Sequence, residues 1–189
     1  MSTTVNIFQN FPISNDEYIE LESKFEDLCK FAAWQLKRKN VKNNCTDELD
    51  DYIQEFRTAM VHAGSYYKRQ LYIEACLETV AKYAKDKFTK KVIKELQRLW
   101  DNRKCHGASR QRFGEYQERI LERIVKRIVP KGDQPNKNKS LIIDKKFPTY
   151  CKNIIWNRQK AVGKKISRER TIRTGLVSLS TFDYLRPNE

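Results

Sequence analysis

The sequence predicts an all-α fold. Only six glycines and five prolines are spread over 189 residues, and apolar residues recur at spacings of three and four. No stretch alternates apolar and polar residues as a half-buried strand does. With 39% hydrophobic and 33% charged residues and a mean hydropathy of -0.78, the chain has the composition of a globular protein with a charged exterior. No apolar run approaches the roughly 18 residues of a membrane span, so we expect no contact with a membrane.

The first helix is expected to begin at a capping box formed by Ser14 and Glu17. The basic, polar stretch 37–44 predicts its end. Its apolar stripe consists of Tyr18, Leu21, Phe25, Leu28, Ala32 and Leu36.

Four more helices are expected before residue 130. The second follows Thr46 as N-cap, with acids in its first turn, where the helix dipole favours them. The third covers 70–84, the fourth runs from Thr89 to Trp100, and the fifth follows a polar turn at Gly107. The apolar side of the second helix consists of Leu49, Ile53, Phe56, Met60, Ala63 and Tyr67. The fifth repeats Phe113, Tyr116, Ile120, Ile124 and Ile128.

A loop, a sixth helix and a tail complete the chain. Residues 130–146 contain two prolines and a glycine among polar residues, which is typical of a mobile loop. Pro148 suits the first turn of a helix, because its missing N–H would have no helical partner there. The helical pattern fades after Lys165, so we expect residues 174–189 to form a flexible tail.

Charge points to a polyanionic partner. The chain has 38 Lys and Arg against 24 Asp and Glu, a net charge of +14. Such an excess is most often found in proteins that bind nucleic acid, although an ordinary basic surface remains an alternative. The N-terminus shows no secretory signal pattern, so we expect the protein to stay in the cytoplasm where it is made.

Residues for catalysis or metal binding are not apparent. Five scattered cysteines form no Cys-x-x-Cys pair and predict free buried thiols, and the adjacent Cys105 and His106 lack a second ligand pair. His62 and His106 have no nucleophile or carboxylate pattern around them, and there is no glycine-rich phosphate loop. We therefore expect a protein that is not an enzyme and needs no cofactor or metal.

A polar face is predicted on the second helix. At 100° per residue its apolar residues cluster on one side, and four polar residues fall nearly opposite. Carboxylates on an exposed helix face can accept paired hydrogen bonds from a partner's arginines. A solvated face without a partner is the alternative. The four residues are Asp51, Gln54, Glu55 and Thr58.

A basic segment with interleaved aromatic residues lies at 145–173. Its ten basic residues face one acid, Glu169. Basic groups hold phosphates and aromatic rings stack on unpaired bases, so single-stranded nucleic acid is the predicted ligand. A helical wheel places Trp156 outward between Lys152 and Lys160, although Trp156 could instead close the core. The predicted ligand-binding residues are Lys145, Lys146, Phe147, Tyr150, Lys152, Trp156, Lys160, Lys164, Arg168, Arg170 and Arg173.

Two motifs in order resemble region 2 of the sigma-70 family of transcription factors. The stretch Asp-Tyr-Ile-Gln-Glu at 51–55, followed by small residues and an aromatic, resembles the core-binding helix of region 2.2. Lys-Phe-Pro-Thr-Tyr at 146–150 and Arg-Thr-Ile-Arg at 170–173 resemble the stretches that flank the promoter-melting helix. With the first helix, the resemblance covers about half of the chain.

The resemblance implies a function and partners. Asp51, Gln54 and Glu55 would dock on the clamp helices of the largest subunit of bacterial RNA polymerase. Phe147, Tyr150 and Trp156 would contact the melted non-template strand of promoter DNA. The sigma region 2-like domain would cover 1–173, with a helical insertion at about 68–144. The Trp-Trp pair of the family is replaced by Asn153 and Ile154.

We expect no second helix-turn-helix domain after Arg173, and in this the chain resembles the late-transcription sigma factors of T-even-type bacteriophages. Those proteins depend on a sliding clamp and end in a short hydrophobic and acidic epitope, which 178–185 resembles. The resemblance implies that the chain opens a -10-like late promoter in the cytoplasm of a host cell. The alternatives are a helical nucleic-acid-binding protein unrelated to transcription and a structural helical bundle. The expected clamp-binding residues are Leu179, Phe182, Asp183, Tyr184 and Leu185.

Overall fold

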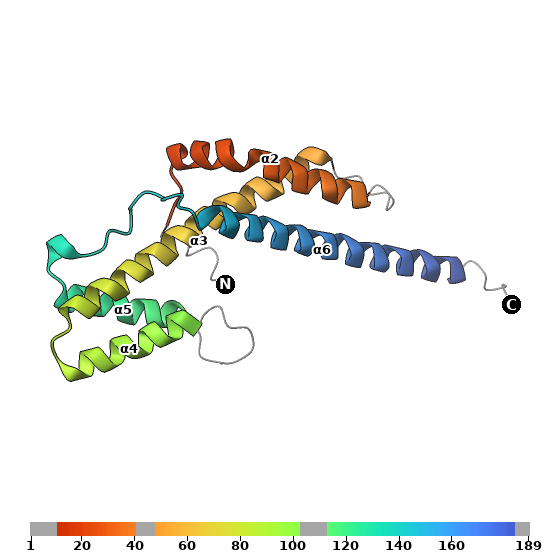
Figure 1. Ribbon diagram of the computed structural model, residues 1–189. Helices are drawn as coiled ribbons and strands as arrows, with labels where there is room; N and C mark the ends of the chain where they lie inside the picture. Colours follow the sequence, from red (N-terminus) through yellow and green to blue (C-terminus); the bar gives the residue numbers. More distant parts are fainter. Residues whose placement is uncertain (1–10, 41–47, 103–112, 184–189) are drawn as a thin grey trace. The chain divides into compact units, whose positions relative to one another are not determined.

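The computed structural model describes residues 11–40, 48–102 and 113–183, with the side chains of 39, 40, 170 and 173–183 left out of the description. Within these ranges all regular structure is helical, as predicted (Figure 1). The elements are α2 (Asn15–Asn40), α3 (Leu49–Tyr83), α4 (Lys87–Asp101), α5 (Glu115–Ile128), the 3-10 helix η3 (Lys131–Asp133) and α6 (Phe147–Asp183).

The chain divides into two compact units. One combines Ile13–Gly64 with Ile142–Glu189 and is called here the α2–α6 unit. The other combines Met1–Pro12 with Ser65–Leu141 and is called the inserted unit. The long segment of the inserted unit begins and ends three residues before the insertion expected at 68–144. Helix α3 supplies its first part to the α2–α6 unit and its second part to the inserted unit.

Helix α2 begins at the predicted capping box. The backbone N–H of Ser14 donates to Glu17 Oε2 at 2.7 Å, and that of Glu17 donates to Ser14 Oγ at 3.3 Å. The predicted stripe faces the interior, with Leu21, Phe25, Ala32 and Leu36 buried. Tyr18 and Leu28 of the same stripe are only half-buried.

The second and third predicted helices are one continuous helix, α3, which corrects the break expected at 68–69. Both residues at the expected break have partners. Lys68 Nζ donates to the carbonyl of Pro12 at 2.8 Å, and Arg69 binds Glu118 Oε2 at 2.6 Å. Since lysine and arginine are good helix formers, nothing ends the helix there. The predicted N-cap Thr46 lies outside the described residues.

Gly64 occupies a close approach inside α3. A Cβ at this position would lie 2.9 Å from Ile13 Cδ1 and 3.2 Å from Leu21 Cδ1. Both distances are shorter than ordinary van der Waals contact. A glycine in mid-helix costs about 1 kcal/mol relative to alanine, and this close packing explains why it is used here.

Helices α4 and α5 begin at local caps. The backbone N–H of Thr89 donates to Asp86 Oδ1 at 2.7 Å, so α4 begins two residues before the expected Thr89. At α5 the backbone N–H of Gly114 donates to Gln117 Oε1 at 3.0 Å. Side-chain caps of this kind satisfy backbone groups that have no helical partner.

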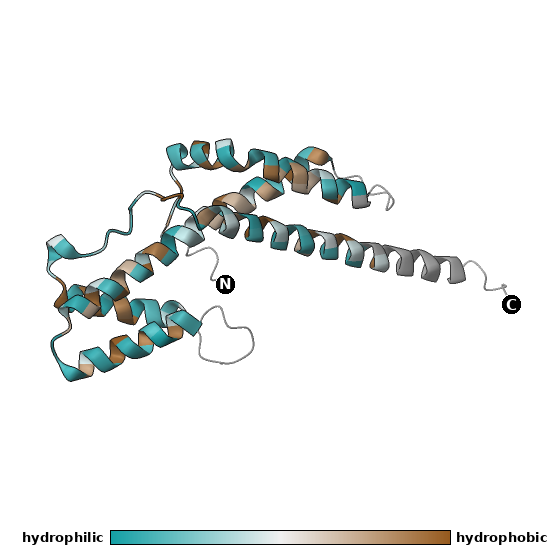
Figure 2. Ribbon diagram, viewed as in Figure 1, coloured by the Kyte–Doolittle hydropathy of each residue, from teal (hydrophilic) through white to brown (hydrophobic). Residues whose placement is uncertain are grey.

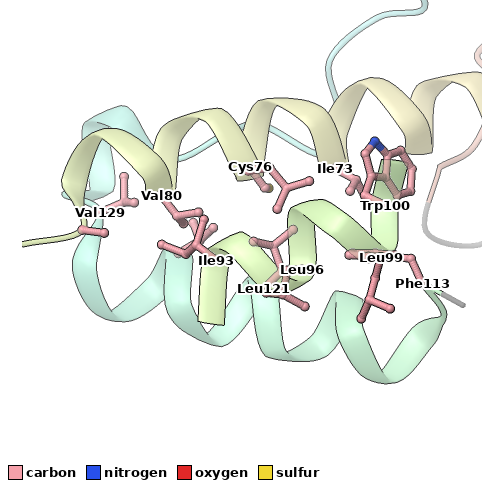
Figure 3. Packing of buried hydrophobic residues seen from close by; sticks show 13 residues of the cluster. Ile73, Cys76, Val80, Ile93, Leu96, Leu99, Trp100, Phe113, Leu121 and Val129 are labelled. Atoms are coloured by element: carbon pink, nitrogen blue, oxygen red, sulfur yellow. The ribbon is translucent and has the colours of Figure 1, made fainter. Parts of the chain in front are cut away.

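The inserted unit has its own hydrophobic core, formed by the second part of α3 with α4 and α5 (Figure 3). Ile73, Val80, Leu96 and Leu121 point into the space between the three helices. The Trp100 ring meets the Phe113 ring edge-on at 5.0 Å. Hydropathy alternates along α4 and α5, as expected for amphipathic helices with one buried side (Figure 2).

The segment 130–146 is a loop with one short helix, η3, as the composition predicted. It is tied to the inserted unit at several points. Leu141 is buried, Gln134 Nε2 donates to the carbonyl of Val129 at 3.0 Å, and Lys137 forms an ion pair with Glu122.

Helix α6 begins one residue before Pro148, because Asp144 caps it. Asp144 Oδ1 accepts from the backbone N–H groups of Lys146 at 2.9 Å and Phe147 at 3.0 Å. The helix continues to Asp183, so the flexible tail expected from residue 174 is wrong for the backbone of 174–183. The fading apolar pattern does not end the helix because 165–183 contains no proline and a single glycine, Gly175. Residues 184–189 lie outside the described residues.

The core of the α2–α6 unit is built from all three of its helices. Helices α2 and α6 pack against each other, with the first part of α3 completing the core. On α6 Cys151, Ile155 and Gln159 are buried, whereas Ala161 is exposed. The buried side chains include Leu21, Phe25, Cys29, Phe56, Met60, Phe147, Cys151 and Ile155.

No described helix combines the length and apolar character that crossing a membrane requires.

Candidate nucleic-acid and protein interface

The polar face predicted on α3 lies at the surface. Asp51, Gln54 and Thr58 are exposed, and Glu55 is partly exposed. Tyr52, Phe56, Ala59 and Met60 of the same turns are buried. The apolar residues thus hold α3 in the α2–α6 unit and leave the polar residues on the opposite side.

Two of these four residues also form local hydrogen bonds, one at the start of α3 and one within it. Asp51 Oδ2 accepts from the backbone N–H of Glu48 at 3.2 Å, which satisfies a donor at the start of α3. The Thr58 hydroxyl donates to the carbonyl of Gln54 at 2.9 Å. These bonds fix the side-chain directions of Asp51 and Thr58 before any partner arrives.

Glu55 forms an ion pair with Arg158 of α6. Its side chain remains 33% exposed and that of Arg158 51% exposed, so the pair lies on the surface of the α2–α6 unit. The pair connects the polar face of α3 with the basic helix α6.

A second ion pair holds α3 to α2. Arg57 Nε and Nη2 donate to the two carboxylate oxygens of Glu26 at 2.9 and 2.6 Å, a forked arrangement. The Arg57 hydrogen bonds lower the pKa of Glu26, because they favour its charged form. The start of α3 is therefore fixed to both neighbouring helices by arginine–glutamate pairs.

His62 lies two turns after Glu55 on α3 and is half-buried. Burial lowers its pKa, because the charged imidazole loses solvation, and the charge of Arg158 acts in the same direction. Glu55 opposes the shift. The neutral ring is thus favoured beside the Glu55–Arg158 pair.

Most of the basic residues predicted to bind nucleic acid are exposed on and just before α6. They do not approach the core and leave a positively charged surface. The exposed residues are Lys145, Lys146, Lys152, Lys160, Lys164 and Arg168. The side chains of Arg170 and Arg173 lie outside the described residues, as do those of Leu179, Phe182 and Asp183 and the whole of Tyr184 and Leu185.

Phe147 does not reach the surface, so its predicted contact with DNA is wrong. The side chain is 0% exposed, and its ring meets the Phe25 ring edge-on at 5.7 Å. Its position at the start of α6 directs it into the core between α6 and α2. Tyr150 is half-buried, with its ring centroid 6.5 Å from that of Phe147.

Trp156 takes part in an aromatic cluster that the sequence analysis missed. It is partly buried, and its ring meets the Phe31 ring of α2 edge-on at 6.2 Å. Phe31 in turn stacks with Trp34 at 6.5 Å. We call Phe31, Trp34 and Trp156 the ring cluster. The guanidinium of Arg38 lies 5.4 Å from the Trp34 ring centroid, within the range of a cation–π contact.

The ring cluster is unusual because its α2 members are exposed. Phe31 is 48% and Trp34 49% exposed. Both residues lie outside the apolar stripe that begins at Tyr18. Large aromatic residues on the polar side of an amphipathic helix are the sequence signal that could have identified them. Adjacent exposed rings beside lysines and an arginine can stack on unpaired bases and hold phosphates.

Gln159 fixes α6 to α2 next to the ring cluster. Its Nε2 donates to the carbonyl of Ala32 at 2.9 Å and lies 3.4 Å from Gln35 Oε1. The side chain is buried at 9% exposure. A buried amide with specific partners determines the register of two helices, so Phe31 and Trp156 are held side by side.

The thiols in the described residues are buried and uncharged. Cys29, Cys76 and Cys151 are free, as predicted, and burial raises their pKa values to about 12, 11 and 12. Cys45 and Cys105 lie outside the described residues. No group of three or more His, Cys, Asp or Glu side chains in the described part of the chain is arranged to hold a metal ion.

Comparison with protein-family models, with curated proteins and with solved structures finds no match.

Proposed function

We propose that the chain is a sigma-like initiation factor of the phage late-transcription type. In this proposal the polar face of α3 binds the clamp helices of a bacterial RNA polymerase core, in the cytoplasm of the host. The basic side of α6 and the ring cluster hold the unpaired non-template strand of a -10-like promoter. No catalytic step or cofactor is assigned to the chain.

The observation that supports this proposal most is the joining of the two surfaces within one compact unit. The exposed residues Asp51 and Gln54 lie on α3, whose Glu55 pairs with Arg158 of α6. A factor that positions melted DNA on polymerase needs its protein-binding and DNA-binding surfaces fixed to each other. The arginine–glutamate pairs and the buried Gln159 supply that rigidity.

In the DNA-binding part of the proposal, the ring cluster supplies the aromatic side chains that stack on unpaired bases. With Phe147 in the core, the described rings that reach the surface beside α6 include the exposed Phe31 and Trp34 and the partly exposed Trp156 and Tyr150. Lys152 and Lys160 lie exposed within one turn of Trp156 along α6. The unpaired strand would thus contact α2 as well as α6.

The C-terminal part of the proposal concerns the sliding clamp. Residues 178–185 would bind it, and the backbone of 178–183 forms the end of helix α6. The apolar and acidic residues of this segment suit an apolar pocket on a partner.

The deciding experiment is co-purification of the full chain with a bacterial core polymerase, followed by runoff transcription on phage late templates with and without the sliding clamp. Retention on core and clamp-stimulated transcripts are the expected results. A chain that binds DNA but neither associates with core nor supports initiation would instead be a nucleic-acid-binding protein unrelated to transcription.

A further inference from the structure

The positive charge of the chain is concentrated in the inserted unit. Residues 65–141 contain 20 Lys and Arg against 9 Asp and Glu, so 20 - 9 gives +11. Residues 13–64 and 142–189 together contain 18 and 15, so 18 - 15 gives +3. Most of the net charge of +14 therefore lies outside the unit to which the proposed function assigns DNA binding.

Helix α4 carries a continuous basic stripe. At 100° per residue its basic residues fall within an arc of about 100°, centred opposite the buried residues Ile93, Leu96 and Trp100. All are exposed, and the structure shows no ion pair for the four lysines within the described residues. The α4 stripe consists of Lys87, Lys90, Lys91, Lys94 and Arg98.

Helix α5 repeats this arrangement. Arg119, Arg123 and Lys126 are exposed and fall within about 60° of one another, opposite the buried Leu121 and Val125. Along both helices basic side chains recur every three or four residues, or about 5 to 6 Å. Such a ladder of cations suits a polymer with regularly spaced negative charges.

The acids of the inserted unit are mostly engaged elsewhere. Glu118 binds Arg69, and Glu122 binds Lys137 of the loop. Asp86 caps α4 by accepting from Thr89, and Asp133 accepts from the Tyr83 hydroxyl. Two acids pair with members of the stripes: Glu95 with Arg98 on α4, and Glu115 with Arg119 on α5 at 4.0 Å. The four lysines of α4 therefore keep their charge available to a ligand.

We propose that the inserted unit binds the phosphate backbone of double-stranded DNA, independently of base sequence, through the basic stripes of α4 and α5. Lysine and arginine bind phosphates without reading bases. Unpaired strands are typically held by stacked rings, whereas the exposed large aromatics described in this unit are the separate side chains Phe88 and Tyr116. This favours the duplex. The proposal does not depend on the proposed function.

The test measures binding of the full chain, without polymerase, to a short labelled duplex of mixed sequence by fluorescence anisotropy at several salt concentrations. The variant Lys87→Gln/Lys91→Gln/Lys94→Gln removes three stripe charges and keeps good helix formers. We expect the slope of log affinity against log salt to become shallower by about 2 to 3, and affinity at about 0.1 M salt to fall on the order of 100-fold.

The matched control is Lys24→Gln/Lys131→Gln/Lys139→Gln, which removes three exposed charges that lie outside both stripes and outside the ring cluster. A site on α4 predicts that the control keeps the wild-type slope to within about one unit. Equal losses in the two variants would show diffuse attraction and overturn the proposal. Tighter wild-type binding to a single strand, lost in the α4 variant, would also overturn it by identifying an unpaired strand as the ligand. Circular dichroism of both variants checks that helicity is retained.

Discussion

Glu55 of α3 and Arg158 of α6 form an ion pair on the surface of the α2–α6 unit, 103 residues apart in sequence. The resemblance to sigma factors assigns Glu55 to the polymerase, but the structure shows that an internal arginine already binds it. Since surface ion pairs contribute about 0 to 1 kcal/mol, a partner's arginine can compete for the same carboxylate. Experiments at Glu55 must therefore separate the two roles.

The first prediction separates them. The single variant Glu55→Arg removes the internal pair and the carboxylate, whereas Glu55→Arg with Arg158→Glu restores a pair in reverse. If Glu55 contacts polymerase, neither protein will be retained on immobilised core enzyme, although both keep wild-type helicity. Gln54→Lys, at an exposed neighbour, should weaken retention in the same way. Recovery of binding in the reversed pair would assign Glu55 a purely internal role.

The second prediction concerns the ring cluster. Trp34→Ala and Trp156→Ala should each weaken binding of the single non-template strand by about 1 to 3 kcal/mol per lost stack, because each removes a surface on which a base stacks. Quenching of tryptophan fluorescence and permanganate reactivity of the open promoter measure this loss. Tyr116→Ala removes a ring that is 71% exposed on α5 and serves as the control. Promoter opening by Trp34→Ala at the wild-type level would exclude a DNA contact at this residue.

The third prediction tests the assignment of Phe147 to the core. Phe147→Ala should lower the free energy of unfolding by about 3 to 5 kcal/mol, since it leaves a cavity beside Phe25. Urea denaturation followed by circular dichroism measures the change. Lys146→Gln, at the exposed neighbour, should leave stability within about 0.5 kcal/mol of wild type. A small stability loss with Phe147→Ala would place this ring at the surface after all.

The fourth prediction concerns pH. The pKa of His62 in the folded chain lies below the ordinary value of 6.5, so acidification protonates the unfolded chain first. The free energy of unfolding should therefore fall as pH drops below about 6.5, and His62 should contribute no pH dependence well above it. His62→Gln should flatten this fall in urea titrations between about pH 7 and 5.5. The lowered pKa of Glu26 acts in a more acidic range.

The control for this pH measurement is His106→Gln, which removes the other histidine of the chain. If His106→Gln flattens the profile and His62→Gln does not, the burial of His62 is not the cause of the pH dependence.

The fifth prediction concerns the C-terminal segment. A chain that ends at Val177 should support basal initiation on a late promoter yet lose stimulation by the sliding clamp, because it lacks the proposed epitope. Runoff transcription with and without clamp measures both activities. An undiminished response to the clamp would remove 178–185 from the proposal.

Local sequence signals predicted the helices better than their ends. The Ser14–Glu17 capping box and the glycine- and proline-poor composition need only near neighbours, and both appear in the structure. The continuity of α3 agrees with the same kind of local signal, because residues 65–83 contain no glycine or proline. What near neighbours do not reveal is that Lys68 and Arg69 bind partners 56 and 49 residues away along the chain.

The same distinction applies to the candidate site. A helical wheel was enough to predict that Asp51 and Gln54 are exposed, since the apolar side of α3 is clear in the sequence. It was not applied to Phe147, which falls on the same side as the buried Cys151 and Ile155, four and eight residues later. The contact of Phe147 with DNA was expected instead from its place among basic residues. The helical wheel also missed the ring cluster, which forms only when Phe31 and Trp156, 125 residues apart, meet across two helices.

Helix α6 contains 37 residues, and at a rise of about 1.5 Å each it is roughly 55 Å long. A continuous helix of this length holds a partner bound at its C-terminal end at a fixed distance from its N-terminal end, whereas a flexible tether would sample many distances. Avidity between two partners then depends on whether their spacing matches that distance. Variants in which α6 is shortened or lengthened by whole turns would show how avidity depends on the distance between the two binding sites.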